Sequence, residues 1–274
     1  MAPAHSLAQQ PAQPTQRLIL AAEADLAGMR EDLTTFADPQ ALTDAAARYW
    51  CDAAARAIAA RGVFHVALSG GSTPRALYQR LARPDYVEKV DWQAVHIYFG
   101  DERAVAPDHS DSNFRMAHEA LLSRVPILPA HIHRMPAEQQ PIVDAATAYE
   151  SVLRRQLPQT ERGIPQFDLV LLGLGTDGHT ASLFPGTPVL YERERLVAEV
   201  YVEKLDSWRM SLTLPVIDAA RQILVLVAGA TKAAIIGELF ASDMDRTYPI
   251  QLIEPLGDMH WYLDAAAAKS LERG

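Results

Sequence analysis

The fold class is decided by one segment, Val63-Phe64-His65-Val66-Ala67-Leu68-Ser69-Gly70-Gly71-Ser72-Thr73-Pro74. Its first half, residues 63–68, is almost wholly apolar and predicts a short buried strand. Its second half predicts a loop followed by a helix, with Thr73 as the N-cap and Pro74 at the first helical position. A buried strand that leads directly into a capped helix is typical of α/β proteins.

The same order of elements recurs along the chain. Further apolar strands are expected at residues 94–99, 167–172 and 223–227. Helices are expected at residues 41–61, 75–81 and 231–240. Because strands that are apolar throughout are buried on both faces, the sequence predicts a three-layer α/β/α, Rossmann-like fold with a mainly parallel sheet. Such sheets bind ligands outside the carboxyl ends of their strands.

Length and composition limit the class of protein. The 274 residues fit one large α/β domain, and no stretch approaches the roughly 18–20 apolar residues of a membrane helix. The one cysteine, Cys51, has no partner for a disulfide or a thiolate zinc site, which favours a reducing compartment and a cytoplasmic location. Residues 1–16 lack the features of a secretory signal and are predicted to be a disordered tail, with residues 17–274 forming a single domain.

The charge of the chain restricts its partners. The formal net charge of −9 disfavours non-specific binding to nucleic acid or anionic lipid. A small anionic molecule is still a possible ligand, provided that arginines, lysines or backbone amides outnumber acidic groups in one local pocket. We therefore expect a small-molecule ligand and neither a nucleic-acid nor a membrane partner.

The loop after the first predicted strand is the first candidate site. Gly70 and Gly71 allow a close approach of the backbone to a ligand, and the helix that follows presents the positive end of its dipole. The hydroxyls of Ser72 and Thr73 and the guanidinium of Arg75 add donors for a phosphate group. The alternative is an ordinary strand-to-helix turn, and the pattern of a nucleotide-binding P-loop is absent.

The segment Gly173-Leu174-Gly175-Thr176-Asp177-Gly178-His179 is the second candidate site. It contains the glycine spacing of a dinucleotide fingerprint, but Pro185-Gly186 follows too soon for the required crossover helix, so we reject that reading. What remains is a loop, with Gly175 inside it, that presents a histidine. His179 is a candidate general base because imidazole titrates near neutral pH. Asp177 either orients that ring or caps a turn.

Three further charged segments follow predicted strands or begin one. Asp101 and Arg103 come directly after the strand at residues 94–99, where the alternative is a solvated turn. Lys232 opens the helix at residues 231–240, a position that opposes the helix dipole unless an anion binds there. Arg209 begins an alternating strand, and an exposed surface arginine is the alternative. A guanidinium suits phosphate because it donates two parallel hydrogen bonds.

The other histidines do not suggest a metal site. Two of them, His65 and His96, fall inside predicted strands, and two more, His131 and His133, lie in a loop with prolines nearby. Neither the His-Glu-x-x-His pattern of zinc peptidases nor the Gly-x-Ser-x-Gly pattern of serine esterases occurs. We therefore expect no metal and no serine-ester mechanism.

Taken together, the motifs resemble the glucosamine-6-phosphate isomerase/6-phosphogluconolactonase family. The resemblance runs from about residue 17 to the end of the chain. It rests on the motifs at residues 67–74, 99–103, 172–186 and 209–213 and on the Trp-Tyr-Leu-Asp sequence at residues 261–264. It implies the α/β/α fold of the glucosamine-6-phosphate deaminase superfamily and no cofactor. Independently of the resemblance, we expect a monomer or weak homo-oligomer.

The resemblance also implies an activity and roles for residues. The lactonase branch hydrolyses 6-phospho-D-glucono-1,5-lactone to 6-phospho-D-gluconate in the oxidative pentose phosphate pathway. The resemblance implies that His179 is the general base. It implies that the phosphorylated substrate is contacted by Gly70, Gly71, Ser72, Arg103 and Lys232.

Two alternative functions are a glucosamine-6-phosphate deaminase/isomerase and a non-catalytic sugar-phosphate sensor. The deaminase relatives have Asp-Glu-Tyr where this chain has Asp-Glu-Arg at residues 101–103. They also have a glutamate at the position of Phe184. Both departures favour the lactonase.

Overall fold

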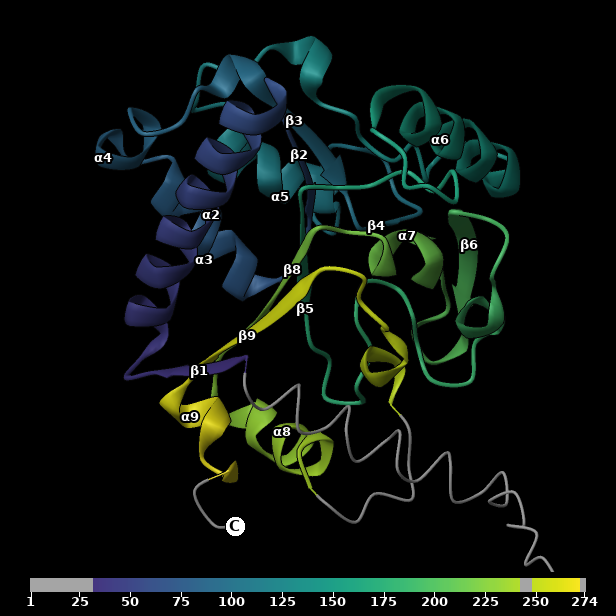
Figure 1. Cartoon of the computed structure of the whole chain (residues 1–274). Helices are drawn as coiled ribbons and strands as arrows, with labels where there is room; N and C mark the ends of the chain where they lie inside the picture. The colour runs from purple at the N-terminus through teal and green to yellow at the C-terminus, as the bar shows by residue number, and fades with distance from the viewer. Residues whose placement is uncertain (1–31, 242–247, 272–274) are drawn as a thin grey trace, which may run out of the picture.

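The strands form one central sheet and one smaller sheet (Figure 1). The computed structural model describes residues 32–241 and 248–271, so the predicted tail, residues 1–16, and the start of the predicted domain, residues 17–31, lie outside the described residues. The central sheet has the order β1-β9-β8-β5-β2-β3, and each neighbouring pair is parallel. Its strands are β1 (Leu33–Phe36), β2 (Phe64–Leu68), β3 (Val95–Phe99), β5 (Leu169–Gly173), β8 (Gln222–Val227) and β9 (Asp258–Asp264).

Helices cover both faces of the central sheet. Figure 1 shows α2 and α3 on one side of it and α6 and α7 on the other. This arrangement confirms the predicted three-layer α/β/α architecture with a parallel sheet. The helices are α2 (Pro39–Arg61), α3 (Ser72–Leu81), α4 (Pro84–Val87), α5 (Asn113–Ala117), α6 (Ile142–Gln156), α7 (Leu214–Asp218), α8 (Ala233–Leu239) and α9 (Ala265–Ala268). None of the described helices is long and apolar enough to pass through a bilayer.

The start of α3 differs from the sequence prediction. The helix begins at Ser72 and its N-cap is Gly71, so Thr73 is not the N-cap and Pro74 is the third helical residue. The reason is the backbone of Gly71, whose φ of 103° is rarely adopted by residues with a side chain. The chain therefore turns into the helix earlier than the cap preference of threonine suggests.

The helix expected at residues 231–240 is also different. It is divided into a 3₁₀ turn, η6 (Ala230–Lys232), and the shorter α8. Lys232 therefore ends the 3₁₀ turn and is the N-cap of α8. It still lies just beyond the carboxyl end of β8, as predicted.

The order of the central sheet reverses between β2 and β5. From β2 the chain adds β3 at one side, and it then returns to place β5 on the other side of β2. A crevice forms at such a reversal because the loops that leave the two strands turn in opposite directions. The two candidate loops of the sequence, residues 69–73 and 173–179, leave these two strands.

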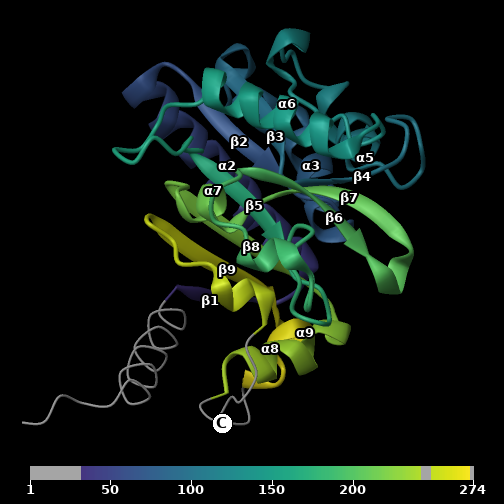
Figure 2. The ribbon, with the colours of Figure 1, turned by 90° about the vertical axis from the view of Figure 1, so that its right-hand side faces the viewer.

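The smaller sheet was not predicted. It is antiparallel, with the order β4-β7-β6, and consists of β4 (Asp101–Arg103), β6 (Val197–Val202) and β7 (Ser207–Leu212). Figure 2 shows β6 and β7 side by side, apart from the strands of the central sheet. Residues 101–103, for which a solvated turn was the alternative, are therefore a strand, and Arg209 lies in the strand that the sequence indicated.

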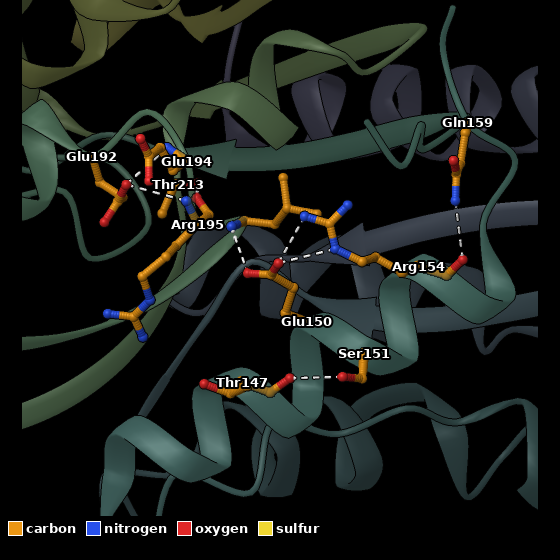
Figure 3. Close-up of polar contacts among 10 residues, drawn as sticks. Thr147, Glu150, Ser151, Arg154, Gln159, Glu192, Glu194, Arg195 and Thr213 are labelled. Atoms are coloured by element: carbon orange, nitrogen blue, oxygen red, sulfur yellow. Dashed lines mark hydrogen bonds and ion pairs between the residues drawn. The ribbon is translucent and has the colours of Figure 1, made fainter. Parts of the chain in front are cut away.

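The residue before β6 is attached to α6 by a hydrogen bond to Glu150 (Figure 3). The Glu150 carboxylate accepts a hydrogen bond of 2.8 Å from the backbone N–H of Leu196. It also forms an ion pair of 2.8 Å with Arg154 of the same helix. The hydroxyl of Thr213 donates to the carbonyl oxygen of Arg195 at 2.6 Å. The hydrogen bond to Leu196 thus ties the start of the β6–β7 hairpin to α6, and the hydrogen bond of Thr213 joins the two ends of the hairpin.

We expect Glu150→Ala to lower the free energy of unfolding by about 1–2 kcal/mol, because it leaves the N–H of Leu196 without an acceptor. The matched control is Glu150→Gln, whose amide oxygen still accepts that hydrogen bond and which should stay within about 0.5 kcal/mol of the wild type. Urea unfolding of the three proteins measures the difference. Equal losses in both variants would show that the Arg154 ion pair, and not the Leu196 hydrogen bond, is the stabilising contact.

Four histidines pack together around the amino-terminal halves of β2 and β3. His65 and His96 are neighbours in the register, and His96 stacks on His131 with ring centroids 3.8 Å apart. The Nδ1 atom of His96 lies 3.2 Å from Nε2 of His133. Burial, with a smaller contribution from neighbouring histidines, lowers the pKa of His65 and of His96 to about 4. His65 and His96 are therefore neutral at neutral pH.

The free energy of unfolding should decrease as the pH falls from 6.5 towards 4. The unfolded chain binds protons on these histidines below about pH 6.5, whereas the folded chain binds them only near pH 4, so acid favours unfolding. Chemical denaturation at several pH values measures the slope, which His65→Gln should reduce. The exposed His118 provides the control, since His118→Gln should leave the slope unchanged. A flat profile in the wild type would contradict this account.

Candidate active site

A cavity of about 220 Å³ opens at the carboxyl ends of β2, β5 and β8. Its size suits a small molecule. Ten of the twelve residues predicted for the site line it: Gly70, Gly71, Ser72, Thr73, Asp101, Arg103, Gly175, His179, Arg209 and Lys232. The structure thus brings together segments that are far apart in the sequence, as expected for the edge of a parallel sheet.

The two other predicted residues lie outside the cavity lining. Asp177 is behind His179 and contacts its ring. Arg75 is exposed on α3 and does not line the cavity. A contact between Arg75 and a ligand in this cavity is not supported by its position.

His179 is held on two sides. Its Nδ1 atom lies 2.5 Å from Oδ1 of Asp177, and its ring stacks on Phe184 with centroids 4.0 Å apart. The same carboxylate oxygen accepts the backbone N–H of His179 at 3.3 Å, so Asp177 both orients the ring and closes a turn. A histidine that donates from Nδ1 to a carboxylate carries its lone pair on Nε2. That atom is left to act in the cavity that His179 lines.

The loop that carries His179 requires glycine at position 175. The N–H of Gly175 donates to the carbonyl oxygen of His179 at 2.8 Å, which folds the loop back on itself. A Cβ atom on Gly175 would lie 2.0 Å from Nδ1 of His179 and 2.6 Å from Oδ1 of Asp177. No side chain fits there without displacing the His179–Asp177 pair, so glycine is needed for the space and not only for backbone freedom.

Of the two members of this pair, only Asp177 is charged at neutral pH. Burial acts to raise the pKa of Asp177, but hydrogen bonds from Lys204 and His179 outweigh it and lower that pKa to about 2. Burial lowers the pKa of His179 below its ordinary value, against the opposing effect of Asp177. The site therefore contains an ionised carboxylate beside a neutral imidazole, which is the form of histidine that accepts a proton.

Asp101 and Glu102 hold the loops around the cavity. Asp101 is buried, and its carboxylate accepts hydrogen bonds from the Ser182 hydroxyl at 2.6 Å and the Asn113 side-chain amide at 3.2 Å. Glu102 is also buried and accepts the backbone N–H groups of Asn113 and Phe114, each at 2.8 Å. The solvated turn considered for this segment is therefore wrong, because both carboxylates are interior structural groups.

Arg103 and Arg209 form a cross-strand pair of like charge. They are directly opposite each other in the register of β4 and β7. Burial, together with the charge of Arg103, lowers the pKa of Arg209. The Nε atoms of both are buried, and neither has a hydrogen-bond partner among the described residues. Two opposed guanidinium groups with unused donors at a cavity are an arrangement that a bound anion would stabilise.

A second group of anion donors lies at the start of α3 and at η6. No described side chain caps α3, and Pro74 has no N–H, so the backbone N–H groups of Ser72 and Thr73 are left without helical partners. Lys232 has no carboxylate within ion-pair distance among the described residues. Burial lowers its pKa, with an opposing effect of Asp177.

Sequence reasoning missed Lys204. It lies in η5 (Glu203–Leu205), the turn between β6 and β7, and its ammonium group donates to Oδ2 of Asp177. The ammonium group also lies 4.8 Å from the centre of the Phe184 ring. In the sequence Lys204 belongs to a short charged stretch that looks like any exposed turn, so no local signal identified it. Thr180 was missed too: it lines the cavity, and its buried hydroxyl has no partner among the described residues.

The described residues contain no group of three or more His, Cys, Asp or Glu side chains able to hold a metal ion. The four clustered histidines, His65, His96, His131 and His133, therefore do not form such a group. The absence of a metal and of a cofactor from the reaction stays a prediction from the sequence.

The chain is similar to known proteins over most of its length. Residues 37–261 match a family model described as glucosamine-6-phosphate isomerases/6-phosphogluconolactonase. A 6-phosphogluconolactonase from Synechocystis is 47% identical over 219 residues, which cover 79% of this chain and 88% of that protein. The solved structure of 6-phosphogluconolactonase from Trypanosoma brucei has a TM-score of 0.78 at 30% identity, covering 87% of this chain and 98% of that one. A monomeric glucosamine-6-phosphate deaminase, only 19% identical, shares the fold, with a TM-score of 0.73 over 87% of this chain and 99% of that one.

We expect Arg209→Met to stabilise the ligand-free protein by about 0.5–1 kcal/mol while weakening the binding of inorganic phosphate at least about tenfold. The substitution removes the like-charge pair, and the methionine still covers the Phe184 ring, over which the guanidinium now lies at 5.4 Å. Thermal unfolding and calorimetric titration with phosphate give the two values.

The matched control is Arg195→Met, which removes an arginine paired with Glu199 at 2.7 Å. It should not stabilise the protein or change phosphate binding. If Arg209→Met lowered stability as much as this control does, the like-charge pair would not be a source of strain.

Proposed function

Because the chain belongs to the glucosamine-6-phosphate isomerase/6-phosphogluconolactonase family, we propose a mechanism by which its cavity performs the reaction of the lactonase branch. The chain hydrolyses 6-phospho-D-glucono-1,5-lactone to 6-phospho-D-gluconate. The observation that carries the mechanism is the His179 ring, fixed through Nδ1 by Asp177 and facing a cavity that is bordered by unpaired cationic groups.

Binding of the phosphate group comes first. The N–H groups and hydroxyl at the start of α3, Arg103 and Lys232 bind the phosphate, and Arg209 adds a second guanidinium beside Arg103. The ring of the lactone then lies between these cations and His179. Holding the ester next to the base in a defined orientation is itself a large part of catalysis.

The hydrolysis proceeds in two steps. In the first, Nε2 of His179 takes a proton from a water molecule as its oxygen attacks C1 of the lactone, which gives a tetrahedral oxyanion and an imidazolium. In the second, the carbonyl re-forms, the bond between C1 and the ring oxygen breaks, and the imidazolium gives its proton to that oxygen. Asp177 stays ionised throughout and stabilises the imidazolium, in keeping with its low pKa.

The glucosamine-6-phosphate deaminase activity is the second candidate, and Phe184 argues against it. In this chain an aromatic ring is stacked on the imidazole at the position where the deaminases have a glutamate. An apolar side chain cannot transfer the protons that opening and isomerisation of an amino sugar require. Freshly generated 6-phosphogluconolactone and glucosamine 6-phosphate, assayed in parallel, distinguish the two activities: release of ammonia from the second would support the deaminase.

The remaining features of the protein are also proposals. We propose a cytoplasmic enzyme that has no nucleic-acid partner and is a monomer or weak homo-oligomer. Its one cysteine, Cys51, is buried and free, which suits a reducing compartment. We also propose that residues 17–274 form one domain, because the strands and helices described here share one hydrophobic core.

His179→Ala should lower kcat by about 10²–10⁴-fold and leave the fold and the binding of inorganic phosphate intact. In the wild type, activity should persist below pH 6.5 and then fall as His179 becomes protonated, because its pKa lies below the ordinary value. Lactone consumption corrected for spontaneous hydrolysis measures both effects. The exposed His118 supplies the control variant His118→Ala, and unchanged turnover in His179→Ala would rule out the proposed base.

A further inference from the structure

The carboxylate of Asp177 has two partners, one on each oxygen. Oδ1 accepts from the His179 ring, and Oδ2 accepts from the ammonium group of Lys204. Lys204 belongs to a different element, the tip of the β6–β7 hairpin, and is separated from Asp177 by 27 positions in the sequence. The mechanism derived above uses Asp177 and His179 and does not use Lys204.

A single aromatic ring joins the same three groups. Phe184 stacks on the imidazole of His179, and the ammonium group of Lys204 lies over the Phe184 ring. The cation is thus fixed by a carboxylate and by an aromatic face, and both of these also contact the proposed base. An ordinary surface ion pair between a lysine and a carboxylate has no such link to the side chain of a proposed base.

We propose that Lys204 is a positioning residue for the lactonase reaction, which holds Asp177 in the orientation that fixes the His179 ring. The proposal rests on the proposed role of His179 as general base. Lys204 acts through Asp177 and needs no contact with the substrate. With one carboxylate oxygen held by the ammonium group, rotation of the carboxylate away from Nδ1 costs an ion pair as well as a hydrogen bond.

The charges that face His179 come from several elements, and Lys204 is one of the positive ones. Asp177 on the same loop and Asp101 on β4 raise the pKa of His179, whereas Lys204 lowers it and burial lowers it most. The other charged groups at the cavity are Arg103 on β4, Arg209 on β7 and Lys232 in η6. Removal of the Lys204 charge removes one of the effects that lower the pKa of His179, while the two carboxylates still raise it. The imidazole should therefore become more basic.

Removal of Lys204 should not unfold the protein. Half of its side chain is exposed, and the neighbouring Leu205 and Glu203 are exposed as well. Its ammonium group contacts Asp177 and one face of the Phe184 ring. A role in stability alone therefore predicts small effects on every measurement, whereas a positioning role predicts an effect on the base.

The test compares Lys204→Met, which keeps the length of the side chain and removes its charge, with Lys204→Arg, which keeps the charge. The matched control is Glu203→Gln, which changes the charge of the same hairpin tip by one without touching Asp177. In each protein the pKa of His179 is measured by NMR titration of the imidazole without substrate, its signal being assigned with His179→Gln. The values of kcat and KM for the lactone are measured over the same pH range.

Lys204→Met should raise the pKa of His179 by about 0.5–1, move the acidic limb of the kcat profile upward with it, and lower kcat by about 3- to 10-fold with KM within about twofold of the wild type. Lys204→Arg should restore most of kcat and of the pKa. Glu203→Gln should leave both nearly unchanged. An unaltered His179 pKa in Lys204→Met, or an equal and opposite change in Glu203→Gln, would overturn the proposal.

The NMR titration requires no turnover, so its result does not depend on the proposed function. If His179 were not the base, the pKa would still respond to Lys204→Met, while kcat would be insensitive to His179→Ala. If Lys204 were not a positioning residue, His179→Ala would abolish turnover and the pKa would not move. The two failures are therefore distinguishable.

Discussion

The parallel pairing of β2 with β5 is the constraint on which the site depends. Because the strand order reverses there, the loops that leave the two strands open a crevice at one edge of the sheet. One loop leads into the uncapped start of α3, and the other carries His179. β8, next to β5, adds Lys232 at the same edge. A slip in this pairing would separate the anion donors from the base.

The features that could be predicted from the sequence are those that depend on residues close together in the chain. Apolar runs predicted β2, β3, β5 and β8 of the central sheet but not its strands β1 and β9, and glycines beside polar residues predicted most of the cavity lining. The small sheet could not be predicted, because β4 has three residues, two of them acidic, and is a strand only through its pairing with β7. Lys204 could not be predicted either, because its role depends on a contact with Asp177, which is 27 positions away in the sequence. The N-cap of α3 is Gly71 and not the predicted Thr73, because Gly71 has a positive φ that the N-cap preferences of residues do not predict.

The cavity concentrates positive charge that the rest of the fold does not neutralise. Arg103 and Arg209 oppose each other across two strands, and Lys232 lies partly buried without a carboxylate partner among the described residues. The buried carboxylate of Asp101, which lines the same cavity, accepts hydrogen bonds from Ser182 and Asn113. Stability is thus lower than it would be with apolar residues at these positions, and the difference is recovered when a phosphorylated ligand binds.

The location of the two arginines on a separate antiparallel sheet has a consequence for how such a protein diversifies. Arg103 and Arg209 lie on β4 and β7, whereas the glycine-lined seat of the imidazole belongs to the central sheet. Substitutions of Arg103 and Arg209 change the groups available to bind an anion, and they leave the hydrogen bond between Asp177 and His179 in place. Related proteins can therefore differ in how they bind the anion while they keep the same histidine base.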